Sequence, residues 1–266
     1  MFNKAARETN KISCCIDMMF SGFDFYDRIN EVKKCGINTV EFWKWTNKDV
    51  DKVKRLLDKN KMRLSVFNID STDEALSYDL SRGILNSGRA EEFVAALCES
   101  IPTYKKLGAS AMIVLIGEGA PYCAENALKC LNAAKPRCEK ENVTLVIEPL
   151  NAIDRKGYSM PYAEPVFELL KKVNSPNIKM LYDIYHQSMT GDLSIEDIRK
   201  NIDLIGHFHV ADSPGRHEPG TGKVDYVKIL NEISELPYDG YIGLEYRATK
   251  SDGETFGFLR EAKVID

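Results

Sequence analysis

Eight short apolar stretches recur along the chain, and segments with helical spacing of their apolar residues separate them. Most of the stretches are continuous apolar runs, as strands covered on both faces require. Regular alternation of strands with helices indicates a parallel sheet. The expected strands cover residues 11–17, 37–43, 62–68, 110–116, 145–149, 178–183, 204–210 and 240–246.

The segments between the strands predict eight helices. In one of them Val50, Val53, Leu56 and Leu57 recur at the spacing of a single helical face. Pro102 is expected to kink or interrupt another, because proline removes a backbone donor inside a helix. The expected helices cover residues 24–35, 48–59, 87–107, 123–140, 162–173, 194–202 and 226–235, with a last one around 254–264.

Four successive strands end in a charged or metal-binding side chain. These residues are Glu148, Asp183, His209 and Glu245, and their intervals of 35, 26 and 36 residues each suit one strand–helix unit. In a (β/α)8 barrel the C-terminal strand ends surround the active site, whereas an open sheet binds ligands at one crevice. We therefore predict an α/β fold, a single (β/α)8 TIM barrel spanning residues 1–266.

Other motifs and the composition agree with this prediction. No GxGxxG or GxxxxGK[ST] motif follows an expected strand, so nucleotide-binding open sheets lose support. The chain has 266 residues, and a barrel needs about 250. The net charge of -4 gives no general attraction for nucleic acid or an anionic membrane, and no apolar run is long enough to span a bilayer.

Cysteine usage bears on the compartment. Seven cysteines occur without CxxC spacing, and the N-terminal segment lacks an apolar targeting region. We therefore expect a cytoplasmic protein with reduced thiols that acts on a small molecule, with no nucleic-acid or membrane partner. Barrels of this type often pair, so a homo-oligomer is left open.

The four strand-end residues predict a metal site. Three carboxylates and one imidazole suit Mn2+ or Mg2+ better than a structural zinc, and Co2+ also fits. The alternative is that some of these carboxylates form ion pairs in the barrel mouth. A metal is favoured because uncompensated buried carboxylates are costly.

Two of the carboxylates suggest the chemistry. Glu148 and Glu245 can face each other across the metal, one removing a proton and the other returning it. The metal would polarise the carbonyl of an α-hydroxy carbonyl compound and stabilise an enediolate.

Further residues near the strand ends are candidate substrate contacts. His186 could hydrogen-bond an oxygen that gains charge, and Arg216 could bind a substrate carboxylate. Trp43 could form an apolar wall, and Lys44 could meet a carboxylate, although core packing and solvation explain these two equally well. The remaining candidates are Asn68 and His217.

Several motifs resemble the xylose-isomerase-like TIM barrels and, within them, the hydroxypyruvate isomerase family. The pieces are VEFW, IEPLN, YDIYH, HFHVADSPGRHEPGTGKVDY and GYIGLEYR, and the most specific is R-H-E-P-x-x-G-x-[IV]-x-Y, from Arg216 to Tyr226. The resemblance implies a metal-associated isomerase that interconverts hydroxypyruvate and tartronate semialdehyde. It also implies Glu148 and Glu245 as the proton-transfer residues, and these two with Asp183 and His209 as the metal ligands.

The chain departs from its relatives at useful positions. Related ketose 3-epimerases often show E-x-x-N-R-[FY]-E, whereas this chain has Ala152 and Asp154 in place of the arginine and the second glutamate. That weakens a 3-epimerase assignment. By resemblance, some hydroxypyruvate isomerases have glutamine at the position of His209. Histidine at this position matches the epimerase branch instead.

Several activities therefore stay open. Isomerisation of 2-oxo-tetronate is compatible with the residues, and a ketose 3-epimerase or inosose-type isomerase or dehydratase is the alternative. From another class, a metal-dependent hydrolase such as an endonuclease uses the same kind of barrel. Only four histidines and an acidic balance argue against it.

Overall fold

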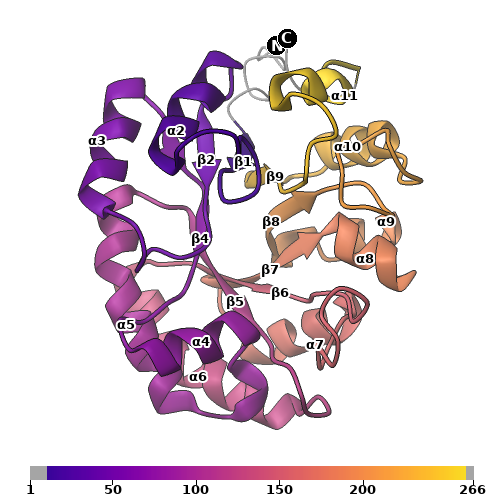
Figure 1. Cartoon of the computed structure of the whole chain (residues 1–266). Coiled ribbons are helices and arrows are strands. Elements are labelled where there is room, and N and C mark those ends of the chain that lie inside the picture. Colours follow the sequence, from indigo (N-terminus) through magenta and orange to yellow (C-terminus); the bar gives the residue numbers. More distant parts are fainter. Residues whose placement is uncertain (1–10, 262–266) are drawn as a thin grey trace.

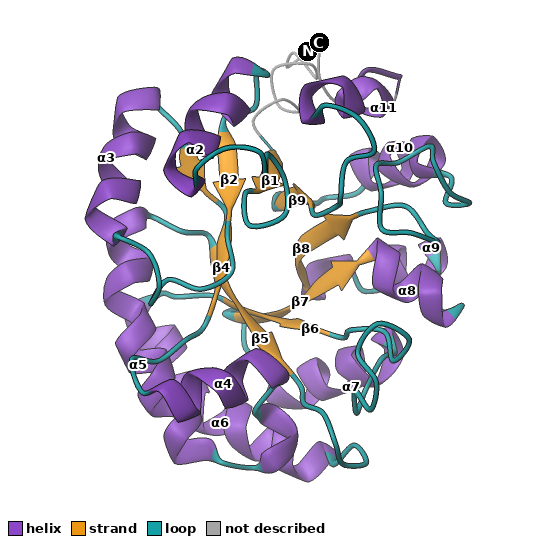
Figure 2. Cartoon of the chain, viewed as in Figure 1, coloured by secondary structure: helices purple, strands orange, loops and turns teal. Residues whose placement is uncertain are grey.

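The computed structural model describes residues 11–261 and shows a barrel of parallel strands surrounded by helices (Figure 1). Figure 2 shows the strands gathered at the centre and the helices outside them. The strand order is β3-β2-β1-β9-β8-β7-β6-β5-β4. The strands are β1 (Ile12–Cys15), β2 (Thr39–Glu41), β3 (Arg63–Leu64), β4 (Val66–Asn68), β5 (Ala111–Leu115), β6 (Leu145–Glu148), β7 (Ile178–Asp183), β8 (Ile205–Val210) and β9 (Tyr241–Leu244). The predicted TIM barrel is confirmed.

The expected third strand is divided in two at Ser65. β3 pairs with β2, and β4 pairs with β5. The backbone of Ser65 joins both sides, because its N–H donates to the carbonyl of Val40 (2.9 Å) and its carbonyl accepts from the N–H of Ser110 (2.7 Å). One expected strand thus appears as two short segments at the place where the barrel closes.

Most strand ends differ slightly from the prediction. β7 has the predicted bounds, whereas the other undivided strands are one or two residues shorter at one end or at both. The apolar pattern continues past the last ladder hydrogen bond because the first loop residues are also buried, as Ile16 and Phe42 are. Periodicity therefore overestimates strand length at the barrel mouth.

Eight helices match the expected ones in place. Pro102 lies inside α5 without ending it, so the predicted interruption is wrong. The last expected helix is a 3-10 turn, η3 (Asp252–Phe256), followed by α11, and its residues 262–264 lie outside the described part of the chain. The matching helices are α2 (Phe25–Lys34), α3 (Val50–Asn60), α5 (Ala90–Leu107), α6 (Ala124–Glu141), α7 (Ala163–Val173), α9 (Ile195–Lys200), α10 (Tyr226–Glu235) and α11 (Gly257–Glu261).

Two helices were not expected, and both follow strands at the barrel mouth. α4 (Glu74–Arg82) begins after Asp73, whose carboxylate accepts from the N–H of Leu76 (2.8 Å). α8 (Ile184–Thr190) begins after Asp183, whose carboxylate accepts from the N–H of His186 (3.0 Å). These are ordinary N-caps, and the helices were missed because they are short and one face carries polar site residues.

The C-terminal end of α4 lies directly against the loop after β5. Gly83 has a φ of +100°, and a Cβ added to it would lie 2.3 Å from the backbone nitrogen of Gly117. Only glycine combines this backbone conformation with so close a contact.

Within residues 11–261 no helix is both long and apolar enough to cross a membrane.

Replacing Gly83 with alanine should lower the free energy of unfolding by about 2 kcal/mol or more, since backbone strain and a steric clash add together. Gly36→Ala is the matched control. Its φ is also positive (+86°), but nothing lies within 4 Å of the added Cβ, so a cost of roughly 1 kcal/mol is expected. Urea unfolding midpoints compare the two, and equal losses would show that the contact with Gly117 is unimportant.

Candidate active site

The four strand-end residues converge on one buried point. The Nδ1 atom of His209 lies 3.3 Å from Glu148 Oε1, 3.5 Å from Glu245 Oε2 and 3.9 Å from Asp183 Oδ2. One ligand atom from each of the four residues lies within 4.8 Å of the others. Each residue is at most 6% exposed, so the cluster is closed off from bulk water on most sides.

The register of the sheet explains this convergence. Asp183 and His209 are direct partners in the β7–β8 pair, and Glu148 ends β6, the next strand along. Glu245 follows β9, and its N–H donates to the carbonyl of Val210 at the end of β8 (3.1 Å). Four adjacent strands thus deliver one side chain each to the same mouth of the barrel.

Glu41 fixes the His209 ring from the side opposite the three strand-end acids. It ends β2, and its Oε1 lies 2.9 Å from Nε2 of His209, a close charge contact that is not aligned as a hydrogen bond. Its Oε2 accepts from the Ser65 hydroxyl (2.9 Å) and lies 3.1 Å from Nε2 of His207. With Nε2 facing Glu41, the Nδ1 atom of His209 faces the three strand-end carboxylates.

Glu41 was not among the predicted site residues. The sequence signal for Glu41 was an acid at the end of the second expected strand, at a position whose side chain points into the barrel. His207 is a core histidine, because it is buried beside Glu41 and does not line the cavity.

Burial and charge act against each other throughout this cluster. Burial alone would lower the pKa of His209, but Glu245 and Glu41 raise it well above its usual range. Burial alone would raise the pKa of Glu41, but His209 and His207 bring it well below its usual range. In Asp183 burial prevails, and the pKa is raised. A positive charge at His209 therefore offsets the acids around it.

Glu245 is held from two sides. The indole N–H of Trp43 donates to its Oε1 (2.7 Å), and the guanidinium of Arg216 donates to its Oε2. Burial would raise the pKa of Glu245, but Arg216 and His209 lower it, so the carboxylate is ionised at neutral pH. Arg216 also lies over the ring of Tyr185, 5.3 Å from its centroid.

His186 is a neutral histidine in α8. Its Nδ1 accepts from the backbone N–H of Asn151 (3.0 Å), so its proton is on Nε2, which lies 3.5 Å from Asp183 Oδ2. Burial, assisted by the charge of Arg216, lowers the pKa of His186 to about 4. The ring can therefore donate from Nε2 at neutral pH.

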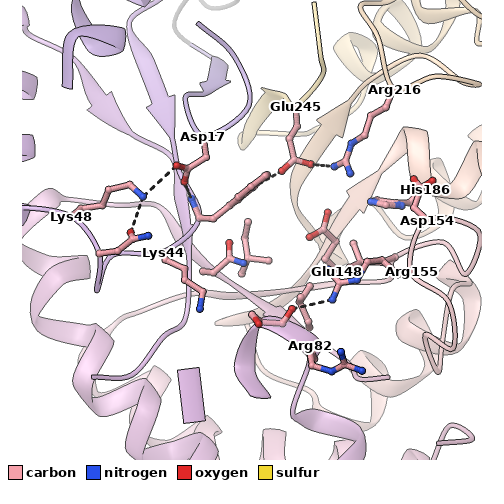
Figure 3. A pocket seen from close by; sticks show the side chains of 17 residues that line it. Asp17, Lys44, Lys48, Arg82, Glu148, Asp154, Arg155, His186, Arg216 and Glu245 are labelled. Atoms are coloured by element: carbon pink, nitrogen blue, oxygen red, sulfur yellow. Dashed lines mark hydrogen bonds and ion pairs between the residues drawn. The ribbon is translucent and has the colours of Figure 1, made fainter. Parts of the chain in front are cut away.

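A cavity of about 440 Å³ opens above the cluster (Figure 3). It is lined by five of the six residues predicted to contact substrate: Trp43, Lys44, Asn68, His186 and Arg216. The sixth, His217, is not part of the lining, and its Nδ1 instead donates to the carbonyl of Arg247 (2.7 Å).

Sequence reasoning missed other residues of the cavity wall. Ser81 and Arg82 come from α4, and Asp154 and Arg155 come from the loop after β6. The two from α4 escaped notice because the helix itself was not expected. In the sequence, Asp154 is distinguished only as the aspartate that stands in place of a glutamate of the epimerase pattern. Nothing in the sequence distinguishes Arg155.

The fold is that of a known family. A family model described as the xylose isomerase-like TIM barrel matches residues 29–263, and the chain belongs to that family. It is 32% identical over 244 residues to hydroxypyruvate isomerase of Escherichia coli (strain K12), covering 89% of this chain and 93% of that one. It is 28% identical over 252 residues to 2-oxo-tetronate isomerase of Cupriavidus necator, covering 92% and 95%.

Solved structures show the same barrel. A Brucella melitensis protein described as an AP endonuclease of family 2 superposes with a TM-score of 0.86 at 25% sequence identity, covering 95% of this chain and 98% of that one. The family resemblance inferred from the motifs is thus confirmed.

Replacing Glu41 with glutamine should lower the pKa of His209 in protein without added metal, because a neutral amide then faces Nε2. NMR titration of isotopically labelled histidine rings would measure the change. Glu168→Gln, an exposed acid on α7, is the control and should leave the four histidine titrations unchanged. An unaltered His209 pKa in Glu41→Gln would contradict the ring-fixing role.

Proposed function

We propose that this protein is a metal-associated isomerase that interconverts small α-hydroxy carbonyl acids through an enediolate. Its isomerase class follows from its family and from relatives named as isomerases over most of both chains. Hydroxypyruvate and tartronate semialdehyde are the preferred substrate pair, and 2-oxo-tetronate is the next candidate. The observation that carries the proposal is the buried cluster of three carboxylates and one imidazole, two of whose acids line the cavity.

The donor atoms fit a divalent cation. Glu148, Asp183, His209 and Glu245 would hold it, and their ligand atoms are already within 4.8 Å of one another. An oxygen-rich set of this kind favours Mn2+, Mg2+ or Co2+. When bound, such an ion polarises a carbonyl and its neighbouring hydroxyl and stabilises the charge of an enediolate.

Glu148 and Glu245 supply the proton transfers in this proposal. One carboxylate removes the proton from the carbon that carries the hydroxyl, and the electron pair moves to form the enediolate. The other glutamate, in its protonated form, then protonates the former carbonyl carbon. The proton of the substrate hydroxyl passes to the oxygen of the former carbonyl. Glu245 is ionised at neutral pH, as a general base must be before it accepts a proton.

Two polar atoms near the cavity support the substrate contacts. The Nε atom of Arg216 and the Oδ1 atom of Asn68 are buried and have no hydrogen-bond partner within the described residues. Both residues line the cavity, so a bound hydroxyl can donate to Asn68 Oδ1, and a hydroxyl or a carboxylate can accept from Arg216 Nε. The neutral His186 would donate from Nε2 to a substrate oxygen that gains charge.

The alternatives have weaker support. A hydrolase with two or three metals needs further ligands, and the other candidate group in the described chain, Glu41 with His207 and His209, shares His209 with the first. A ketose 3-epimerase would use the same four ligands but lacks the arginine after Asn151. The cytoplasmic location and a homo-oligomer stay predictions from the sequence.

The acid–base role predicts that Glu148→Gln and Glu245→Gln each lower turnover by about 10²–10⁴-fold, because the amide cannot transfer the proton. NMR in D2O measures both isomerisation of hydroxypyruvate and exchange at the reacting carbon. Glu168→Gln is the matched control and should keep normal activity. Near-normal turnover in either cavity variant would exclude the two-carboxylate mechanism.

Metal binding predicts a change in stability that does not depend on turnover. Mn2+ at about 100 times its Kd should stabilise the fold by about 2.7 kcal/mol and raise Tm by roughly 5–10 °C. Asp183→Asn should reduce the increase strongly, since asparagine still caps α8 but loses the charge. An equal Tm increase in the wild type and the variant would mean that Mn2+ binds elsewhere.

A further inference from the structure

Three cations of the cavity lining lie on or beside helix α4. Lys44, Arg82 and Arg155 all line this cavity. The ammonium of Lys44 donates to the hydroxyl of Ser77 (2.8 Å), and the guanidinium of Arg155 donates to the carbonyl of Ser81 (3.0 Å). Ser77, Ser81 and Arg82 belong to one helix, so α4 carries one of the three charges and contacts the other two (Figure 3 labels all three cations).

A single carboxylate stands against these cations. Glu118 lies 2.9 Å from Arg82 and accepts from Arg155 (2.7 Å to its Nε), and its side chain is only 9% exposed. Lys44 has no carboxylate partner among residues 11–261, and its contacts there are the hydroxyl and carbonyl of Ser77. The group therefore carries an excess of two positive charges.

The other cations of the cavity are already neutralised. Lys48 lies 3.3 Å from Asp17, and Arg216 is paired with Glu245. The excess positive charge of the cavity lining is thus carried by the cations on and beside α4. Low-dielectric walls strengthen such a field inside a cleft, so the cavity orients a ligand with one anionic end.

We propose that Lys44, Arg82 and Arg155 form an oxyanion subsite that selects substrates with a terminal carboxylate or phosphate beyond the reacting carbons. This rests on the proposed function, because the α-hydroxy carbonyl group is assigned to the carboxylate end. A cavity of about 440 Å³ is larger than a three-carbon acid requires. The subsite therefore favours longer acidic substrates over neutral ketoses of the same length.

Equilibrium binding tests the subsite without reference to turnover. Calorimetry would measure the Kd of inorganic phosphate and of malonate for the purified protein, for Lys44→Met and for Arg82→Met. Each variant should weaken binding at least about 10-fold, which corresponds to a loss of about 1.4 kcal/mol. Lys156→Met removes a charge from the exposed neighbour of Arg155 that does not line the cavity, and it should change Kd less than twofold.

The outcomes separate this proposal from the isomerase mechanism. Stronger binding of phosphate indicates a phosphate ester, stronger binding of malonate indicates a carboxylate, and both support the subsite. Anion binding that is equal in the wild type, Lys44→Met and Arg82→Met, as expected for an anion held only at a metal, overturns it. Glu148→Gln should retain the anion affinity, so a failed isomerase mechanism leaves this test intact.

The kinetic counterpart compares two substrates in Lys44→Met. The acidic substrate 2-oxo-tetronate should show a larger rise in KM than erythrulose, a neutral ketose of the same length, with little change in kcat for either. An equal rise for both substrates would show that Lys44 does not act at a distal subsite.

Discussion

The site depends on one imidazole surrounded by acids. Three carboxylates cannot stay ionised together in a buried barrel mouth without a compensating charge, and in the protein without metal His209 supplies it from the centre. Glu41 holds that ring in place from the opposite face. The sheet register brings the strand-end acids together, and this contact decides which face of the imidazole meets them.

The barrel was predictable because alternation of apolar runs with helical segments is a strong and repeated signal. The convergence of Glu148, Asp183, His209 and Glu245 followed from topology, since parallel strands end at the same face. Sequence reasoning failed where contacts join distant segments. Nothing local reveals that Glu41 at the end of β2 reaches His209 on β8, or that Arg155 approaches α4.

The missed helices have a common physical reason. α4 and α8 lie at the barrel mouth, where part of each helix faces a polar cavity instead of the core. Their apolar periodicity is accordingly weak, although Asp73 and Asp183 mark their starts. The same two helices carry Arg82 and His186, so the segments hardest to predict were those that shape the ligand's surroundings.

Asp183 has two duties, one for each of its carboxylate oxygens. One oxygen caps α8 through the N–H of His186, while the other faces the imidazoles of His186 and His209. A segment grafted between β7 and β8 to change specificity would require the acid at the end of β7 to be retained in this rotamer. The chain is therefore free to diversify its substrate range through α4, and much less free to do so through α8.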